Sequence, residues 1–284
     1  MNIRNYGKTF MLMAIMTSIF VLIGSAVGGK NGAIYGLVAA GLMNLGSYFF
    51  SDKIVLAMQR AKVISKNEAP QLYAIVNKLR QRAGLPMPKI AIVPTKAPNA
   101  FATGRNPQHA VVAVTQGITQ ILSRDELEGV LGHELGHVKN RDILTMTIAA
   151  TMAGAISIIS RFGMYGSFSD RDERGSSGGN ILLALVGPLA AMLIQMAISR
   201  SREYEADKAG AEISGKPEAL ASALNKLQQA AKTMRMRVNP STAHLFIVNP
   251  LSGGGLMSLF STHPPAAERI KRLLEIARNM GRIQ

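Results

Sequence analysis

The sequence predicts an α+β chain that is mostly helical, in which helical transmembrane hairpins are joined to a globular domain with a small mixed β-sheet. Three observations lead to this class. The 284 residues are 48% hydrophobic and only 17% charged, a composition that excludes a disordered chain. Four apolar blocks without a single charge interrupt the chain. The segments between these blocks have the helical and strand periodicities of a folded domain.

The composition restricts the chemistry and the partners of the chain. Cysteine is absent, so disulfides, thiolate-bound metals and thiol nucleophiles are excluded, and any metal must be held by His, Asp or Glu. The net charge of +15 is typical of nucleic-acid binders or of membrane proteins with basic flanks. The sequence has no basic stripe interleaved with aromatic residues, so we expect a lipid bilayer and no nucleic acid as partner.

Residues 10–27 and 33–50 are the first two apolar blocks, each near the lower limit for a helix that crosses a hydrocarbon core of about 30 Å. Only a glycine-rich turn with Lys30 separates them, so residues 1–52 are predicted to form an N-terminal transmembrane hairpin. A secretory signal is the alternative for the first block. It is disfavoured because no cleavage site precedes a soluble stretch and the second block follows at once.

Residues 143–159 and 181–198 are two further apolar blocks, within a mid-chain segment 143–199. Both are rich in small residues, which favours a second transmembrane pair over the alternative of buried core helices. Basic residues lie before the first block and after the second block of each pair, on the side opposite the loop that joins them. They are Arg4, Lys8, Lys53, Arg60, Lys62, Lys66, Lys139, Arg141, Arg200 and Arg202. The excess of positive charge there predicts that both termini and the polar bulk face the cytoplasm.

Residues 53–142 and 200–284 are predicted to be the two parts of one globular domain. Apolar residues at helical spacing predict a helix over residues 70–83, and runs of Val and Ile predict strands at 89–93 and 110–114. Residues 99–104 could form a third extended piece at a sheet edge. Ser123 and Glu126 have the spacing of a helical capping box, and further helices are predicted at 217–233 and up to residue 279.

The capped helix contains the motif His133-Glu134-Leu135-Gly136-His137. Two His residues at i and i+4 lie on one helical face, so both imidazoles can bind a single ion. Glu134 points to the side, where it can accept a proton from a water molecule that Zn²⁺ has made acidic. The alternative is an ordinary amphipathic helix, but the spacing is rarely met by chance in a chain with 5 His.

Two His ligands require a third protein ligand if one position is to stay open for water. Glu203 is the strongest candidate, and Asp207 follows it on the same helical face, where a carboxylate could orient a ligating imidazole. Glu205 is turned roughly 200° away from Glu203. The alternative for Glu203 is a solvated residue that pairs with Arg202 or Lys208.

These motifs resemble the HtpX family of membrane-bound zinc metalloproteases. The resemblance rests on HELGHVKNRD, SREYEADKAGA, THPPAAERI and NAFATG, and it extends over essentially the whole chain. It implies a zincin-like catalytic domain with one Zn²⁺, with His133, His137 and Glu203 as ligands and Glu134 as catalytic base. It also implies a heat-shock-linked enzyme of the cell inner membrane that cleaves misfolded or damaged membrane proteins.

The resemblance also suggests roles for two other segments. Asn99, Ala100 and Phe101 would form an edge strand that binds the substrate backbone by strand addition, with an ordinary surface turn as the alternative. His263 could stabilise the oxyanion, although a plain helix start after it is equally compatible with the sequence. His109 and His244 are expected to be structural or surface residues.

Two other functions stay open. The first is an intramembrane-cleaving protease, which the charged residues around the motif disfavour. The second is a catalytically silent scaffold with a structural metal site, which would not need Glu134. Both halves of the predicted metal site adjoin the mid-chain apolar pair, so we expect substrates to be presented at the cytoplasmic membrane surface. The sequence leaves homo-oligomerisation open.

Overall fold

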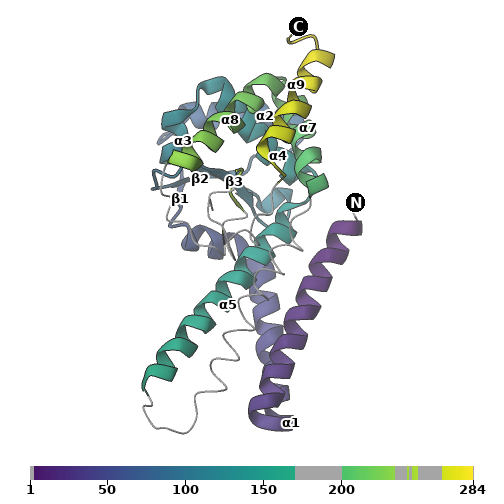
Figure 1. Cartoon of the computed structure of the whole chain (residues 1–284), viewed down its shortest axis with the longest axis vertical. Coiled ribbons are helices and arrows are strands. Elements are labelled where there is room, and N and C mark those ends of the chain that lie inside the picture. The colour runs from purple at the N-terminus through teal and green to yellow at the C-terminus, as the bar shows by residue number, and fades with distance from the viewer. Residues whose placement is uncertain (1–2, 170–199, 234–241, 243–244, 249–263, 284) are drawn as a thin grey trace.

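The computed structural model describes residues 3–169, 200–233, 242, 245–248 and 264–283. Long helices extend from one end of a globular part that contains the sheet and the remaining helices (Figure 1). The predicted class, α+β and mostly helical with a small mixed sheet, is confirmed.

The first long element, α1 (Ile3–Met58), consists of two helical arms joined at a kink. The kink lies at Gly28 and Gly29, and the positive φ of 57° at Gly29 favours glycine there. The arms touch backbone to backbone near the kink, because a Cβ on Gly24 would overlap the carbonyl oxygen of Gly32. Gly7–Ala26 and Gly28–Met58 are each long and apolar enough to cross a membrane, as the predicted hairpin requires.

The outer surface of α1 is strongly apolar. Phe10, Leu22, Tyr35 and Leu42 are all more than two-thirds exposed, with exposed fractions of 75%, 68%, 73% and 68%. A soluble protein rarely exposes a continuous apolar surface of this kind. The hairpin therefore has the surface expected of helices that contact lipid.

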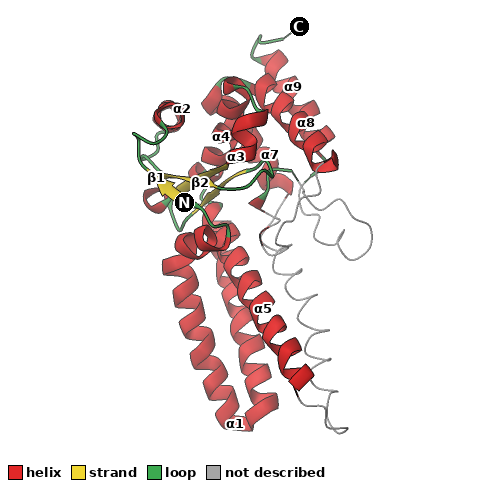
Figure 2. Cartoon of the chain, turned by 90° about the vertical axis from the view of Figure 1, so that its left-hand side faces the viewer, coloured by secondary structure: helices red, strands yellow, loops and turns green. Residues whose placement is uncertain are grey.

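The third apolar block forms the start of α5 (Ile143–Ser169), which runs beside the arms of α1 (Figure 2). Ile148 and Met152 on α5 pack against Leu12 and Met16 on α1. α5 contains the whole of the block predicted at 143–159, and its first part, Ile143–Ile156, is an apolar helix. The fourth predicted block, 181–198, lies outside the described residues.

The sheet has four strands in the order β1-β2-β4-β3, with β1 at Lys62–Ile64, β2 at Lys89–Val93, β3 at Ala100–Thr103 and β4 at Val111–Thr115. β2 and β4 are parallel, whereas the β1–β2 and β3–β4 pairs are antiparallel. The prediction of an extended edge segment at 99–104 is confirmed by β3. The three-residue strand β1 was not predicted, because so short a run carries no recognisable alternation.

The two faces of the sheet bury different parts of the chain. Ile90, Val112 and Val114 pack into the core formed with the helices of the globular part. Their neighbours Ala91 and Ala113 point the opposite way, into a cluster with residues of α1 and α5. This two-residue alternation is the normal geometry of a strand. The sheet thus lies between the long apolar helices and the helices that carry the candidate site.

The globular part contains six further α-helices within the described residues: α2 (Pro70–Ala83), α3 (Gln116–Ile121), α4 (Arg124–Lys139), α7 (Arg200–Ser214), α8 (Pro217–Thr233) and α9 (Ala266–Asn279). A short 3-10 turn, η1 (Pro107–His109), precedes β4. The bounds predicted for α2 and α8 and the end of α9 agree with the structure, and α3 was not predicted.

Candidate metal centre

The position of α4 is set by its first turn. The Ser123 hydroxyl accepts a hydrogen bond from the Glu126 backbone N–H at 3.3 Å, and the Glu126 carboxylate accepts one from the Ser123 N–H at 2.7 Å. This is the predicted capping box. It fixes the residue at which the helix starts, and with it the face on which His133 and His137 lie.

Glycines bring α4 and α7 into backbone contact. A Cβ placed on Gly210 of α7 would lie 2.7 Å from the backbone nitrogen of His133. One placed on Gly136 of α4 would lie 3.0 Å from the carbonyl oxygen of Ala206. No real Cβ tolerates such distances without a shift of its neighbours. This close approach is what brings Glu203, in the first turn of α7, against the two imidazoles.

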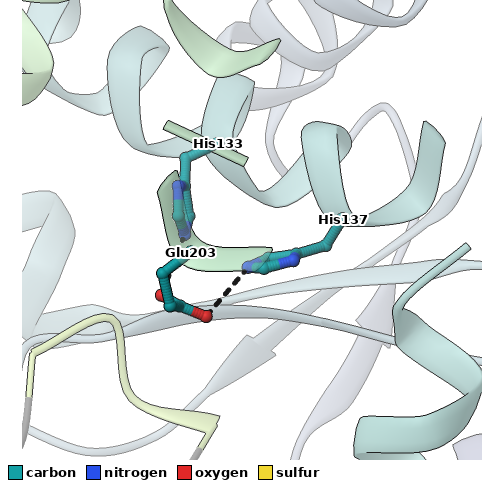
Figure 3. A group of neighbouring side chains, drawn as sticks. All are labelled: His133, His137 and Glu203. Carbon is teal, nitrogen blue, oxygen red and sulfur yellow. Dashed lines mark ion pairs between the residues drawn. The ribbon is translucent and has the colours of Figure 1, made fainter. Parts of the chain in front are cut away.

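The three predicted donors come together (Figure 3). His133 Nε2 lies 3.9 Å from Glu203 Oε2, and His137 Nε2 lies 3.6 Å from Glu203 Oε1. All three donor atoms are within 4.8 Å of one another, and the side chains are at most 3% exposed. Ligands about 2.1 Å from a tetrahedral ion are about 3.4 Å apart, so the spacing fits a small cation. The donor set, with two imidazoles and one carboxylate, suits zinc.

Glu134 lies between the donors and the edge strand. Its Oε2 accepts a hydrogen bond from the backbone N–H of Ala102 in β3 at 2.8 Å. Burial raises the pKa of Glu134 to about 7; the charge of Glu203 raises it too, whereas His137 lowers it. A carboxyl group with a pKa near neutrality is suited to exchange protons with a reacting water.

Each imidazole is oriented by a carboxylate at its other ring nitrogen. His133 Nδ1 lies 2.9 Å from Asp207 Oδ1, the arrangement predicted from the spacing of Glu203 and Asp207. His137 Nδ1 lies 3.3 Å from Asp142 Oδ2. Burial alone would lower the pKa of His137, but the Asp142 hydrogen bond and the nearby carboxylates raise it to about 9. Because a carboxylate can only accept a hydrogen bond, the Nδ1 atom of each imidazole must carry the hydrogen. The Nε2 atom of each ring is the one that faces Glu203.

Arg269 of α9 is a charged residue of the site that the sequence did not single out. Its Nε and Nη2 donate to the two carboxylate oxygens of Asp207 at 2.8 and 2.7 Å. Burial alone would raise the pKa of Asp207, but the guanidinium outweighs it and lowers the pKa to about 2. The signal was present in THPPAAERI, where an Arg follows the helix start. Nothing in the sequence indicated that it is buried.

The residues predicted to bind substrate immediately precede Ala102, whose N–H contacts Glu134. Ala100 and Phe101 belong to the edge strand β3 and are 0% and 2% exposed. The side chain of Asn99 is engaged within the chain: its Nδ2 donates to the Leu245 carbonyl at 3.2 Å, and its Oδ1 accepts from the Ile247 N–H at 3.1 Å.

The other three histidines lie apart from the three donors or outside the described residues. His109 is exposed at η1 and hydrogen-bonds Asn106. His263, the predicted oxyanion residue, and His244 are among the residues that the structure does not describe.

Comparison with known proteins assigns a family to this arrangement. Residues 66–277 match peptidase family M48. The "Protease HtpX homolog" of Thermococcus sibiricus is 54% identical over 99% of both chains. That of Thermococcus kodakarensis is 55% identical over 96% of this chain and 97% of its own length. That of Desulforapulum autotrophicum is 57% identical over 95% and 89%.

A solved structure shares the fold at lower sequence identity. The crystal structure of S. mikatae Ste24p is 20% identical, with a TM-score of 0.51, and the similarity covers 95% of this chain. The matched region spans 66% of the length of that protein.

Proposed function

Because this chain belongs to peptidase family M48, and is thus a membrane-bound metalloprotease, we propose that it is a zinc endopeptidase whose ion is held by His133, His137 and Glu203. The convergence of these three buried donors from α4 and α7 is the observation that carries the proposal. Three protein ligands leave one position of a tetrahedral ion open, as in hydrolytic zinc sites. When bound, the ion supplies Lewis acidity, which polarises the scissile carbonyl and makes a water molecule more acidic.

Glu134 is the general base in this proposal. Its carboxylate would take the proton from the attacking water and later deliver it to the leaving amine. The 2.8 Å hydrogen bond from the Ala102 N–H holds one carboxylate oxygen against the sheet edge, which leaves the other oxygen for the proton. Burial, which raises the pKa of Glu134, suits a carboxyl group that both accepts and returns a proton.

The edge strand β3 is the proposed substrate platform, with Ala100 and Phe101 at its start and Asn99 immediately before it. Its outer edge has no strand partner in the described sheet, and Ala102 on that edge contacts Glu134. A peptide added along this edge would therefore carry its carbonyl groups past the donors. Recognition through backbone groups is independent of side-chain identity and suits unfolded segments. His263 remains our proposal for oxyanion stabilisation.

We further propose that the protein is a multi-pass protein of the cytoplasmic (cell inner) membrane, with the catalytic domain and both termini in the cytoplasm. The flanking basic residues support this orientation. Asp142, which holds His137, directly precedes α5, so the metal centre lies beside the apolar helices. Substrates would then be damaged or misfolded membrane proteins, cleaved at the membrane surface under heat or other stress.

The decisive test compares the full-length protein in detergent with its Glu134→Gln variant. We expect Glu134→Gln to bind zinc like the wild type while kcat/KM for an unfolded protein substrate falls about 10²- to 10⁴-fold. Zinc content is measured by metal analysis and cleavage by gel. Glu205→Gln is the matched control, because Glu205 lies on α7 but is turned away from Glu203. It should leave both the zinc content and the cleavage rate unchanged. A Glu134→Gln protein that cleaves at the wild-type rate contradicts the assignment of the base.

A further inference from the structure

Arg269 is buried in a way that an arginine seldom is. It is 1% exposed, although a guanidinium in a protein interior is costly unless every charge and donor is met. It lies on the C-terminal helix α9, far along the chain from both α4 and α7. Its partners explain the burial, because its contacts converge on one small region around His133.

The first contact is a two-pronged ion pair with Asp207. Nε and Nη2 donate to separate oxygens of the same carboxylate at 2.8 and 2.7 Å. This fork fixes the plane and rotation of the carboxylate, which a lysine ammonium, a single point charge, cannot do. Asp207 Oδ1 in turn lies 2.9 Å from His133 Nδ1. The orientation of the imidazole therefore depends on that of the guanidinium.

The remaining contacts fix the guanidinium itself. Nη1 donates to the Ile247 carbonyl at 2.8 Å and lies 3.6 Å from Glu203 Oε2. Arg269 thus contacts Asp207, the partner of His133, and also lies directly beside Glu203. The helix that carries it is held by Leu273 and Ala277, both fully buried.

We propose that Arg269 is a positioning residue of the metal centre, which acts through Asp207 to hold His133 in the geometry for binding the ion. The proposal rests on the assignment of the zinc site above. In this proposal Arg269 contacts neither the ion nor the substrate. A guanidinium cation this close to the donors repels a metal cation, so by charge alone its removal would strengthen binding. If instead Arg269 positions the site, its removal should weaken zinc binding. Mutation of carboxylates that orient ligating imidazoles commonly lowers the metal affinity about 10- to 100-fold.

The sign of the effect therefore separates the two roles. We expect Arg269→Met to lower the Zn²⁺ affinity of the full-length protein about 10- to 100-fold, measured by competition with a chelator. Arg269→Lys keeps the charge but loses the fork, and should also weaken binding. In both variants the visible absorption of bound Co²⁺ should change, because it reports the geometry of the donors. Lys271→Met is the matched control: this exposed residue also lies on α9, and the variant should bind zinc like the wild type.

A double variant protects the test against a variant that merely folds poorly. If Arg269 acts through Asp207, adding Arg269→Met to Asp207→Asn should weaken binding little beyond Asp207→Asn alone. Losses that multiply would overturn the proposal, as would unchanged or tighter zinc binding in Arg269→Met, or full affinity in Arg269→Lys. A wild type that binds no zinc would refute the proposed function itself. A wild type that binds and cleaves, beside Arg269 variants of equal affinity, would refute only this inference.

Discussion

At the scale of residues, each imidazole of the candidate metal centre is paired with a carboxylate from a different element. Asp207 belongs to α7, whereas Asp142 lies just before α5 and reaches back to His137 across the end of α4. The two contacts leave both Nε2 atoms facing Glu203. The orientation of the two imidazoles therefore depends on α7 and on the residue that precedes α5, the helix that packs against α1.

We expect Asp142→Asn to weaken zinc binding about 10- to 100-fold, because an amide is a poorer acceptor for the His137 N–H and lacks the negative charge. Chelator competition on the full-length protein measures the change. Asp125→Asn, on the exposed first turn of α4, is the control and should retain wild-type affinity. Equal affinities for Asp142→Asn and the control would show that His137 needs no partner.

The sequence predicted the residues that share a helical face and missed those that do not. Glu203 and Asp207 are separated by one turn, and so are His133 and His137, so spacing alone grouped them. Asp142 contacts His137 only because the chain turns between α4 and α5. Arg269 reaches the site through tertiary packing of α9. Neither contact has a periodic signature, which is why sequence patterns could not reveal it.

At the scale of elements, the capping box of α4 gives a pH-dependent contribution to stability. Burial alone would raise the pKa of Glu126, but the Lys226 ammonium and the Ser123 N–H outweigh it and hold the pKa below its ordinary value. A carboxyl group with a lowered pKa stabilises the fold above its unfolded pKa of about 4.3. That contribution is lost as the pH falls through the lowered folded value.

Glu126→Gln should accordingly destabilise the protein by about 1 kcal/mol at pH 7, and the difference from the wild type should shrink as the pH falls below about 4. Unfolding in detergent over a pH series measures it. A difference that grows in acid would mean that the folded protein prefers the protonated carboxyl.

The glycine contact between α4 and α7 is the second feature at this scale. Gly210→Ala would place a methyl group 2.7 Å from the His133 nitrogen, so the helices must separate. We expect a loss of about 1–3 kcal/mol of stability and a marked drop in zinc affinity, since Glu203 moves with α7. Gly46→Ala is the matched control, because its Cβ meets nothing within 4 Å. Zinc affinity that survives Gly210→Ala would mean that the donors do not depend on this contact.

Elements were predictable where their own residues determine them. α2 begins with Pro70 and ends just before its C-cap Gly84, whose φ of 69° suits glycine, so the sequence itself marks both ends. β1 and α3 are too short for a periodic pattern, and they exist because neighbouring elements pair with or support them. The residues that join α1 to α5, such as the hydrogen-bonded hydroxyls of Thr9 and Thr145, likewise follow from packing.

At the scale of the whole molecule, the orientation in the membrane is open to a direct test. The chain has no cysteine, so a single introduced thiol reports its own location. We expect Lys30→Cys, at the exposed hairpin turn, to react with a membrane-impermeant maleimide on intact cells. Lys66→Cys, which is also exposed, should react only after the cells are opened. The reverse pattern would invert the proposed topology.

The donors of the metal centre are nitrogen and oxygen atoms only. Peroxide converts a coordinating thiolate, step by step, to sulfenic, sulfinic and sulfonic acids. Imidazoles and a carboxylate offer no such reaction at the coordinating atom. A zinc ion held at the proposed centre is therefore not exposed to loss through oxidation of a coordinating sulfur.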